Sequence, residues 1–161
     1  MSNLALRGGS GRPPVIHQDR QRLWLRLFSC SASLEKRIRV RLKDEFDTSL
    51  PSFGILAALS RVPEGLTMGE LSTAVRVSNA TVTGIVSELC ADELVVREMS
   101  RDDRRVQLVT LTDKGRQRFV RIARVHAEWI EQAFAGLSDE EVGVLLKLLG
   151  SVRESINQNQ I

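Results

Sequence analysis

Two short runs of β-branched and apolar residues flank a charged loop, and this pattern restricts the fold more than any other feature of the chain. The first run, residues 94–99, reads LVVREM, and the second run, residues 106–111, reads VQLVTL. In the second run apolar and polar side chains alternate, and Val106, Leu108 and Leu111 are expected to face inward. The two runs are therefore predicted to pair as a β-hairpin with one buried face.

The loop between the two runs, residues 100–105, reads SRDDRR and is dominated by charged groups. Such a tip cannot build a core, but a guanidinium is always charged and presents five donors in a rigid fork. That geometry suits a phosphate backbone or a nucleic-acid groove. The tip residues expected to make this contact are Arg101, Asp103, Arg104 and Arg105. A solvated tip, with Asp103 as a plain turn residue, is the alternative interpretation.

A short helix is predicted before the hairpin. Thr67 can cap the start of this helix, and Glu70 can reach back to the cap from three residues further on, which is the capping-box pattern. We expect the helix to end near Arg76. Its expected buried residues are Leu71, Ala74 and Val75.

A second helix is predicted directly after the first, with Ser78 as its cap and only secondarily as a phosphate contact. Apolar residues at helical spacing define its buried face: Val82, Ile85, Val86 and Leu89. The remaining positions carry short side chains that let another macromolecule approach closely: Asn79, Ala80, Thr81, Thr83, Gly84 and Ser87. Two helices joined by a tight turn form a helix-turn-helix, and the added hairpin makes it a winged helix-turn-helix.

Four segments resemble the MarR family of bacterial transcription regulators. They are residues 68–71 (MGEL), 77–86 (VSNATVTGIV), 103–105 (DRR) and 111–115 (LTDKG). The resemblance extends over nearly the whole chain beyond the N-terminal arm. Its most specific element is the Asp-x-Arg pattern followed by Leu-Thr-x-x-Gly at this spacing.

The resemblance implies a mainly α-helical homodimer with a small hairpin wing, in which the first and last helices form the dimer interface. It also implies that the second helix of the helix-turn-helix enters the major groove of double-stranded DNA, and that Arg105, positioned by Asp103, reaches the minor groove. Family members often carry basic residues where this chain has Gly84 and Glu88. They also often carry glycine before the wing, where this chain has Glu93.

The net charge of +3 over 161 residues does not by itself indicate a partner. Residues 61–118 contain equal numbers of acidic and basic residues, so the predicted reading module depends on a few placed contacts. No apolar run is long enough to span a membrane and no signal-peptide core is present, which makes the cytoplasm the expected location. Because nucleophile motifs, phosphate loops and metal-ligand spacings are lacking, we expect no enzymatic activity, metal or cofactor.

The predicted organisation has three parts. Residues 1–18 are expected to form a mobile arm, because their glycines and prolines cannot bury much surface. Residues 19–48 and 112–161 are expected to form a helical dimerisation region. Residues 49–111 are expected to form the winged helix-turn-helix for DNA binding.

Four further helices are predicted around this module. They cover residues 18–45, a segment from Pro51 to before Pro63, residues 112–135, and a last segment that begins after Ser138 with a second capping box. The last helix carries the apolar residues Val142, Leu145, Leu146, Leu149 and Val152, so it ends apolar and close to the terminus. Such a surface needs a partner, and a second subunit is the natural one.

A small effector is expected from the resemblance and from aromatic and basic residues on the flanking helices. An aromatic anion needs apolar walls and a cation, and the candidates are Trp24, Phe28, Arg26, Arg37, Arg41, His126 and Trp129. The alternative is that the aromatic residues fill a core or an interface, while the basic run 36–43 is a solvated helix face. Residues 23–27 (LWLRL) and 77–84 resemble a subgroup linked to aromatic-acid breakdown, which implies an aromatic acid or its CoA thioester as effector.

Cys30 lies where some MarR relatives keep a peroxide-sensing thiol. This chain has no tyrosine to hydrogen-bond such a sulfur, so an inert thiol is the favoured interpretation. The sequence therefore predicts a ligand-responsive, dimeric DNA-binding regulator, a repressor that binds a pseudo-palindromic operator and is released by its effector. The alternatives are a redox-sensing regulator acting through Cys30 and a winged-helix protein-interaction module without DNA binding.

Overall fold

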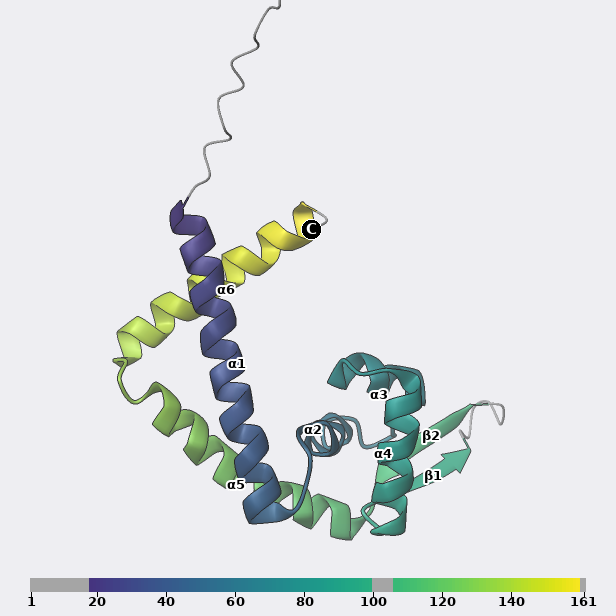
Figure 1. The fold of residues 1–161 in the computed structure, drawn as a ribbon. Coiled ribbons are helices and arrows are strands. Elements are labelled where there is room, and N and C mark those ends of the chain that lie inside the picture. The colour runs from purple at the N-terminus through teal and green to yellow at the C-terminus, as the bar shows by residue number, and fades with distance from the viewer. Residues whose placement is uncertain (1–17, 100–105, 160–161) are drawn as a thin grey trace, which may run out of the picture. The chain divides into compact units, whose positions relative to one another are not determined.

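The computed structural model describes residues 18–99 and 106–159. The elements are helices α1 (Gln18–Phe46), α2 (Leu50–Leu59), α3 (Met68–Val75) and α4 (Asn79–Ala91), strands β1 (Val95–Met99) and β2 (Gln107–Leu111), and helices α5 (Asp113–Phe134) and α6 (Asp139–Gln158) (Figure 1). This is the predicted mainly α-helical fold with a two-stranded wing. The chain divides into two units, Met1–Glu35 and Lys36–Ile161, so the boundary falls within α1.

In the first unit, the described residues form one regular helix with an exposed surface. Trp24 and Phe28, four residues apart, stack with 6.0 Å between their ring centroids. Arg22 and Asp19 form an exposed ion pair near the start of the helix. No residue of this unit that the structure describes is buried within the single chain.

The core of the second unit is organised around α2, an almost wholly apolar helix. Ser49 caps α2 by accepting from the Ser52 backbone amide, and Pro51 lies in its first turn, as the sequence predicted. Helices α2, α3 and α4, strands β1 and β2, and the segment between α4 and β1 all contribute buried residues to this core. These residues are Ile55, Leu56, Leu59, Leu71, Val82, Val86, Leu89, Leu94, Val95 and Val109. Helix α2 contacts α3, α4, α5 and β2, so it is the centre of this unit.

Strands β1 and β2 pair antiparallel, from Val95 with Leu111 to Met99 with Gln107. The expected inward face of β2 was wrong in part, because Val109, not Val106 or Leu108, is the fully buried residue. Val109 and Leu66 exchange two backbone hydrogen bonds, of 3.0 Å and 2.8 Å, on the edge of β2 away from β1. The segment before α3 thus fixes β2 in register, and this long-range pairing decides which side of the strand faces the helices.

Both predicted capping boxes are present. The Glu70 carboxylate accepts from the Thr67 amide and hydroxyl, each at 2.8 Å, while the Glu141 carboxylate accepts from the Ser138 amide at 2.8 Å. In each box, two hydrogen bonds from the cap residue hold the pKa of the glutamate below its usual value. The bond from the backbone amide has the larger effect and the bond from the side chain the smaller. Local sequence therefore determines where α3 and α6 begin.

The junction between the wing and α5 is tightly packed. A Cβ atom added to Gly115 would lie 1.9 Å from the Leu94 carbonyl oxygen, so only glycine fits there. Glu93 adopts a left-handed conformation with φ of 60°. The Thr112 hydroxyl donates to the Glu93 carbonyl at 2.7 Å, and the Lys114 ammonium pairs with the Glu93 carboxylate at 2.9 Å. These contacts hold a residue other than glycine in the turn.

Helix α5 is amphipathic and buries Gly115, Ile122 and Trp129, whereas α6 has no buried residue. Exposed apolar side chains line much of α6, and they include Val144, Leu145, Leu146, Leu148 and Leu149. Among the described helices, none is both long enough and apolar enough to cross a lipid bilayer.

Candidate nucleic-acid interface

Helix α4 has one buried and one exposed face. Val82, Val86 and Leu89 fix it to the core. Ile85 was expected on the buried face but is only half-buried. Every residue predicted for the contact surface of this helix is exposed: Ser78, Asn79, Ala80, Thr81, Thr83, Gly84 and Ser87. In α3, Leu71 is buried as predicted, but Ala74 is exposed, because α3 is short and only one side of it faces α2.

The exposed face of α4 is smooth and rich in hydroxyl groups. Ser78 Oγ caps the helix by accepting from the Thr81 amide at 3.2 Å. The Thr83 hydroxyl donates to the Asn79 carbonyl and the Ser87 hydroxyl donates to the Thr83 carbonyl, both at 2.8 Å. These bonds hold the hydroxyl groups against the helix, so their oxygens remain available as acceptors. A Cβ added at Gly84 would meet no atom within 4 Å, which leaves room for close approach.

Helix α4 contains no lysine or arginine, and its one charged residue is Glu88. A cation reaches its exposed face from the neighbouring strand, because the Arg97 guanidinium of β1 donates to Ser87 Oγ at 2.9 Å and reaches the Thr83 carbonyl at 3.5 Å. The sequence analysis did not single out Arg97. Its polar position in β1 was a signal, but only the packing of β1 against α4 brings it to this face.

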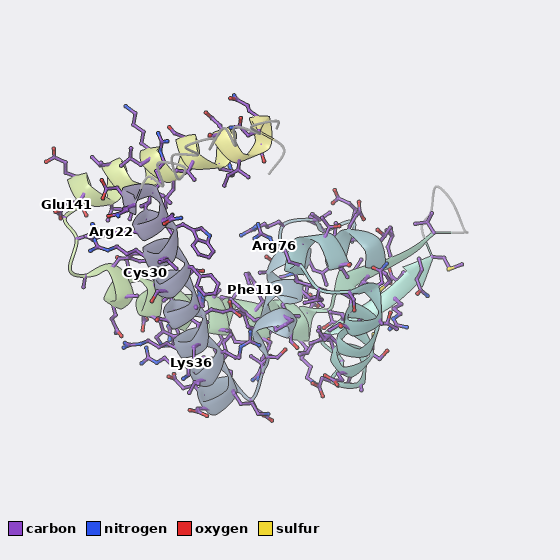
Figure 2. The ribbon with its side chains drawn as sticks, turned by 45° about the horizontal axis from the view of Figure 1, so that its top comes forward. Arg22, Cys30, Lys36, Arg76, Phe119 and Glu141 are labelled. Atoms are coloured by element: carbon purple, nitrogen blue, oxygen red, sulfur yellow. The ribbon has the colours of Figure 1, made fainter. Side chains whose placement is uncertain are left out.

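The turn between α3 and α4 carries a second exposed arginine. Arg76 ends α3 in a left-handed conformation with φ of 55°, and Figure 2 labels it on the unit that contains α3 and α4. The Ser72 hydroxyl donates to the Val77 carbonyl at 2.7 Å and so closes the turn. The predicted contacts at Arg101, Asp103, Arg104 and Arg105 lie outside the described residues.

The residues expected to bind an effector fall into separate groups. In the second unit, the Arg41 guanidinium lies 4.9 Å from the Trp129 ring centroid, and His126 lies 6.2 Å from the same ring. Phe53 of α2 packs against His126 with 5.1 Å between centroids. Burial lowers the pKa of His126, since a low-dielectric environment disfavours the charged imidazolium. Arg41, His126 and Trp129 are therefore brought together, beside the core helix α2.

The other effector candidates lie elsewhere in the structure. Trp24 and Phe28 stack on each other in the first unit, where Arg26 is also exposed. Arg37 is exposed in the second unit. Cys30 is exposed on α1 (Figure 2). Cys90 is half-buried on α4, and both cysteines are free thiols. In the part of the chain that the structure describes, no three His, Cys, Asp or Glu side chains come together as a metal site.

Comparison with known proteins identifies the class. A model of the MarR family matches residues 46–106. The solved structure of a MarR family transcriptional regulator from Silicibacter pomeroyi is 31% identical, with 86% of this chain and 96% of that chain covered and a TM-score of 0.72. Sco3205, a MarR family regulator from Streptomyces coelicolor solved in complex with DNA, is 25% identical, with 91% and 93% covered and a TM-score of 0.77.

A curated relative, the HTH-type transcriptional repressor IacR of Pseudomonas putida, is 31% identical over 68% of this chain and 65% of that protein. The chain spans 55–65% of the length of the first three curated relatives it matches. Helices α3 and α4 with the hairpin define a winged helix-turn-helix protein. The chain belongs to the MarR family, a family of transcription regulators and not of enzymes.

Proposed function

We propose that the chain is a dimeric transcription regulator that binds a pseudo-palindromic DNA operator through α4 and acts as a repressor. The observation that carries this proposal is the exposed face of α4, which has short hydroxyl side chains, an open position at Gly84 and a cation supplied by Arg97. A major groove accepts a helix with such a face, and hydroxyl groups and guanidinium are common partners of base edges and phosphates. The complex of Sco3205 with DNA supports the proposal.

The residues of the proposed interface have different tasks. Ser78 and the first turn of α4 contact a phosphate, because the free amides of a helix N-terminus favour anions. The side chains that face base edges are Asn79, Ala80, Thr81, Thr83, Gly84 and Ser87. Arg105, positioned by Asp103, reaches the minor groove, and Arg101 and Arg104 contact DNA from the same hairpin tip. Arg97 is an addition to this set and contacts a phosphate beside Ser87.

The proposed dimer rests on α6. Its exposed Val144, Leu145 and Leu148, with Leu137 before the helix, line an apolar groove of about 380 Å³. A second copy of the chain covers this surface, and a two-fold axis then presents two copies of α4 to DNA. We expect half-sites about 10 bp apart, which footprinting on the DNA upstream of the gene will measure.

Gly84 provides a direct test of the DNA interface. Gly84→Leu adds a side chain to the exposed face without a clash inside the protein, and it raises the helix propensity of α4. We expect the fold to be retained and DNA affinity to fall by about 1–3 kcal/mol, the size of one lost base contact. Fluorescence anisotropy with the upstream duplex and a scrambled duplex measures the change at several salt concentrations.

Gly69→Leu is the matched control, because Gly69 is also an exposed helical glycine with open space around it, but lies on α3. We expect this variant to bind DNA like the parent. Equal affinity of Gly84→Leu and the parent for the upstream duplex would exclude α4 as the reading helix. A parent chain that prefers no duplex would instead favour a protein-interaction module.

We further propose that an aromatic acid or its CoA thioester releases the protein from DNA. The grouping of Arg41, His126 and Trp129 supports this proposal, because it combines a cation with aromatic surface. A ligand shifts DNA binding only by its difference in affinity between the bound and free conformations. Titration of the DNA complex with benzoate or benzoyl-CoA is expected to release DNA, whereas free CoA, which lacks the aromatic group, is the control. Arg41→Gln is expected to weaken that release.

A redox response is the second candidate, because Cys30 is exposed and therefore accessible to oxidants. Peroxide added to the DNA complex tests it. Release by peroxide alone, with loss of that response in Cys30→Ser, would replace the aromatic effector by oxidation. Release by an aromatic ligand that persists in Cys30→Ser would support the first proposal.

A further inference from the structure

A row of cations follows one side of α5. Lys114, Arg118 and Arg121 occur at i, i+4 and i+7, so they share a helix face. With Gln117 they line a groove of about 600 Å³, which is also lined by Ala91 at the end of α4 and by Asp92 and Leu94 in the segment that follows it. The groove lies between the C-terminal end of α4 and the start of α5. Figure 1 shows the backbone of both segments.

Two of these cations are held in place by a single rigid residue. The Arg118 guanidinium donates to the Phe46 carbonyl, and the Arg121 guanidinium lies 5.9 Å from the centroid of the Phe46 ring. Phe46 is itself buried and packs against Trp129 with 6.1 Å between ring centroids. The hydrogen bond anchors the Arg118 guanidinium and the ring contact favours one orientation of Arg121 before any ligand arrives, which reduces the entropy lost on binding.

Neither guanidinium is neutralised by an ion pair with a carboxylate of the described residues. Lys114 pairs with Glu93, and the nearby Asp47 pairs with Lys43 while also attracting the Arg118 guanidinium electrostatically. Asp92 is the one acidic residue that lines the groove. The three lining cations against one lining carboxylate leave a net positive groove with free guanidinium donors.

The end of α4 does not repel an anion strongly. Its last carbonyl groups already accept backbone hydrogen bonds, because the Glu88 carbonyl accepts from Asp92 at 3.0 Å and the Cys90 carbonyl accepts from Glu93 at 3.0 Å. The Leu89 carbonyl accepts from Leu94 at 2.9 Å. These hydrogen bonds largely compensate the partial negative charge of the helix C-terminus before a ligand enters.

We propose that this α5 groove binds the diphosphate group of a small phosphorylated ligand through Arg118 and Arg121. A planar guanidinium matches phosphate oxygens in a bidentate geometry, and two fixed guanidiniums match two adjacent phosphate groups. Because the groove includes the end of α4, its occupant contacts the helix proposed to read DNA. Diphosphate binding in this groove does not depend on the proposed function. Only an effect of the bound ligand on DNA release rests on that function.

Calorimetric titration of the full chain with inorganic pyrophosphate, without DNA, tests the site. Arg121→Gln removes one exposed guanidinium and is expected to weaken pyrophosphate binding about tenfold, the loss of one charge-assisted contact. Arg153→Gln on α6 removes the same charge far along the chain and is expected to bind like the parent. Arg118→Lys keeps the charge but loses the planar fork, so its affinity is expected to lie between those of Arg121→Gln and the parent.

Several outcomes overturn the proposal. One is the absence of pyrophosphate binding to the parent chain at millimolar concentration. Another is equal weakening in Arg121→Gln and Arg153→Gln, which would indicate general attraction by net charge. A third is a loss of affinity for duplex DNA in Arg121→Gln with unchanged pyrophosphate binding, which would make the groove a contact for the DNA backbone. Failure of the parent to bind DNA affects the proposed function alone.

Discussion

Helices α2 and α6 are both rich in leucine and other apolar residues, but they have opposite environments. In α2, Phe53, Ile55, Leu56 and Leu59 are all buried within their own chain. In α6, twice as long, no residue is buried, and Leu148 is 57% exposed. Leucine content alone is therefore a poor guide to where a helix packs. The environment depends on whether partners come from the same chain.

The difference teaches how the two helices contribute to stability. The contacts of α2 form when one chain folds, so they do not depend on protein concentration. The apolar surface of α6 gains its burial only from a partner, and by the proposal above that partner is a second copy. Four changes separate these two contributions.

The largest effect is expected in the core. Leu56→Ala removes a fully buried side chain of α2 and leaves a cavity, which we expect to cost about 2–5 kcal/mol of unfolding free energy. Leu148→Ala in α6 is the matched control and is expected to stay within about 0.5 kcal/mol of the parent at high dilution. Urea unfolding followed by circular dichroism measures both. An equal cost at high dilution would mean that α6 packs within its own chain.

The next effect concerns association. Leu148→Asp places a charge in the apolar groove of α6, and a two-fold axis places it there twice, so we expect the dimer dissociation constant to rise about tenfold or more. Arg153→Gln changes the net charge by the same amount and is expected to leave association unchanged. Sedimentation equilibrium measures both constants. A Leu148→Asp chain that associates like the parent would remove α6 from the proposed interface.

Removal of a helix cap is expected to lower stability by less, and the loss is expected to extend over the whole core for α3 but only over the first turn for α6. Thr67→Ala and Ser138→Ala each remove a cap, at a typical cost of about 1 kcal/mol to the helix concerned. Because Leu71 ties α3 to the core, Thr67→Ala is expected to lower global stability, whereas Ser138→Ala is expected to increase hydrogen exchange only in the first turn of α6. Exchange spread over the whole chain in Ser138→Ala would contradict this.

The smallest expected difference between α2 and α6 is in how their contributions to stability depend on pH. The pKa of His126, which packs on Phe53 of α2, is lowered by burial, so the unfolded chain binds a proton more readily than the folded chain. Its neutral form contributes stability that is present above about pH 6.5 and is lost as the pH falls through the lower folded pKa. The lowered pKa of Glu141 makes the cap of α6 fail only in a more acidic range.

Thermal unfolding between pH 7 and pH 4 measures this dependence. His126→Gln is expected to flatten the stability curve below about pH 6.5, because the titrating group is gone. Glu141→Gln is expected to alter the curve only in a more acidic range. An unaltered slope in His126→Gln would show that other groups control the acid response of the core.

Local patterns predicted much of the fold. The helix starts at Thr67, Ser78, Thr112 and Ser138 were all read correctly from residues that can cap a helix. These signals act within one turn, so they need no knowledge of the rest of the chain. The exposed face of α4 was also predicted, because helical spacing separates it from Val82, Val86 and Leu89.

Long-range packing decided what the local patterns left open. The inward side of β2 depends on pairing with Leu66, more than 40 positions earlier, and the alternation of β2 alone favoured the wrong residues. Arg97 reaches Ser87 only because β1 packs beside α4. Arg118 and Arg121 become a fixed pair only because the end of α1 places Phe46 against α5.

The sequence by itself determined the helix boundaries, the hairpin and the short polar face of α4, because capping and periodicity are properties of neighbouring residues. The tertiary structure alone decided which cations meet which surfaces. It also decided which apolar helix is buried, because both depend on contacts between residues far apart in the chain. Two helices that both carry many leucines therefore became a core and an uncovered surface.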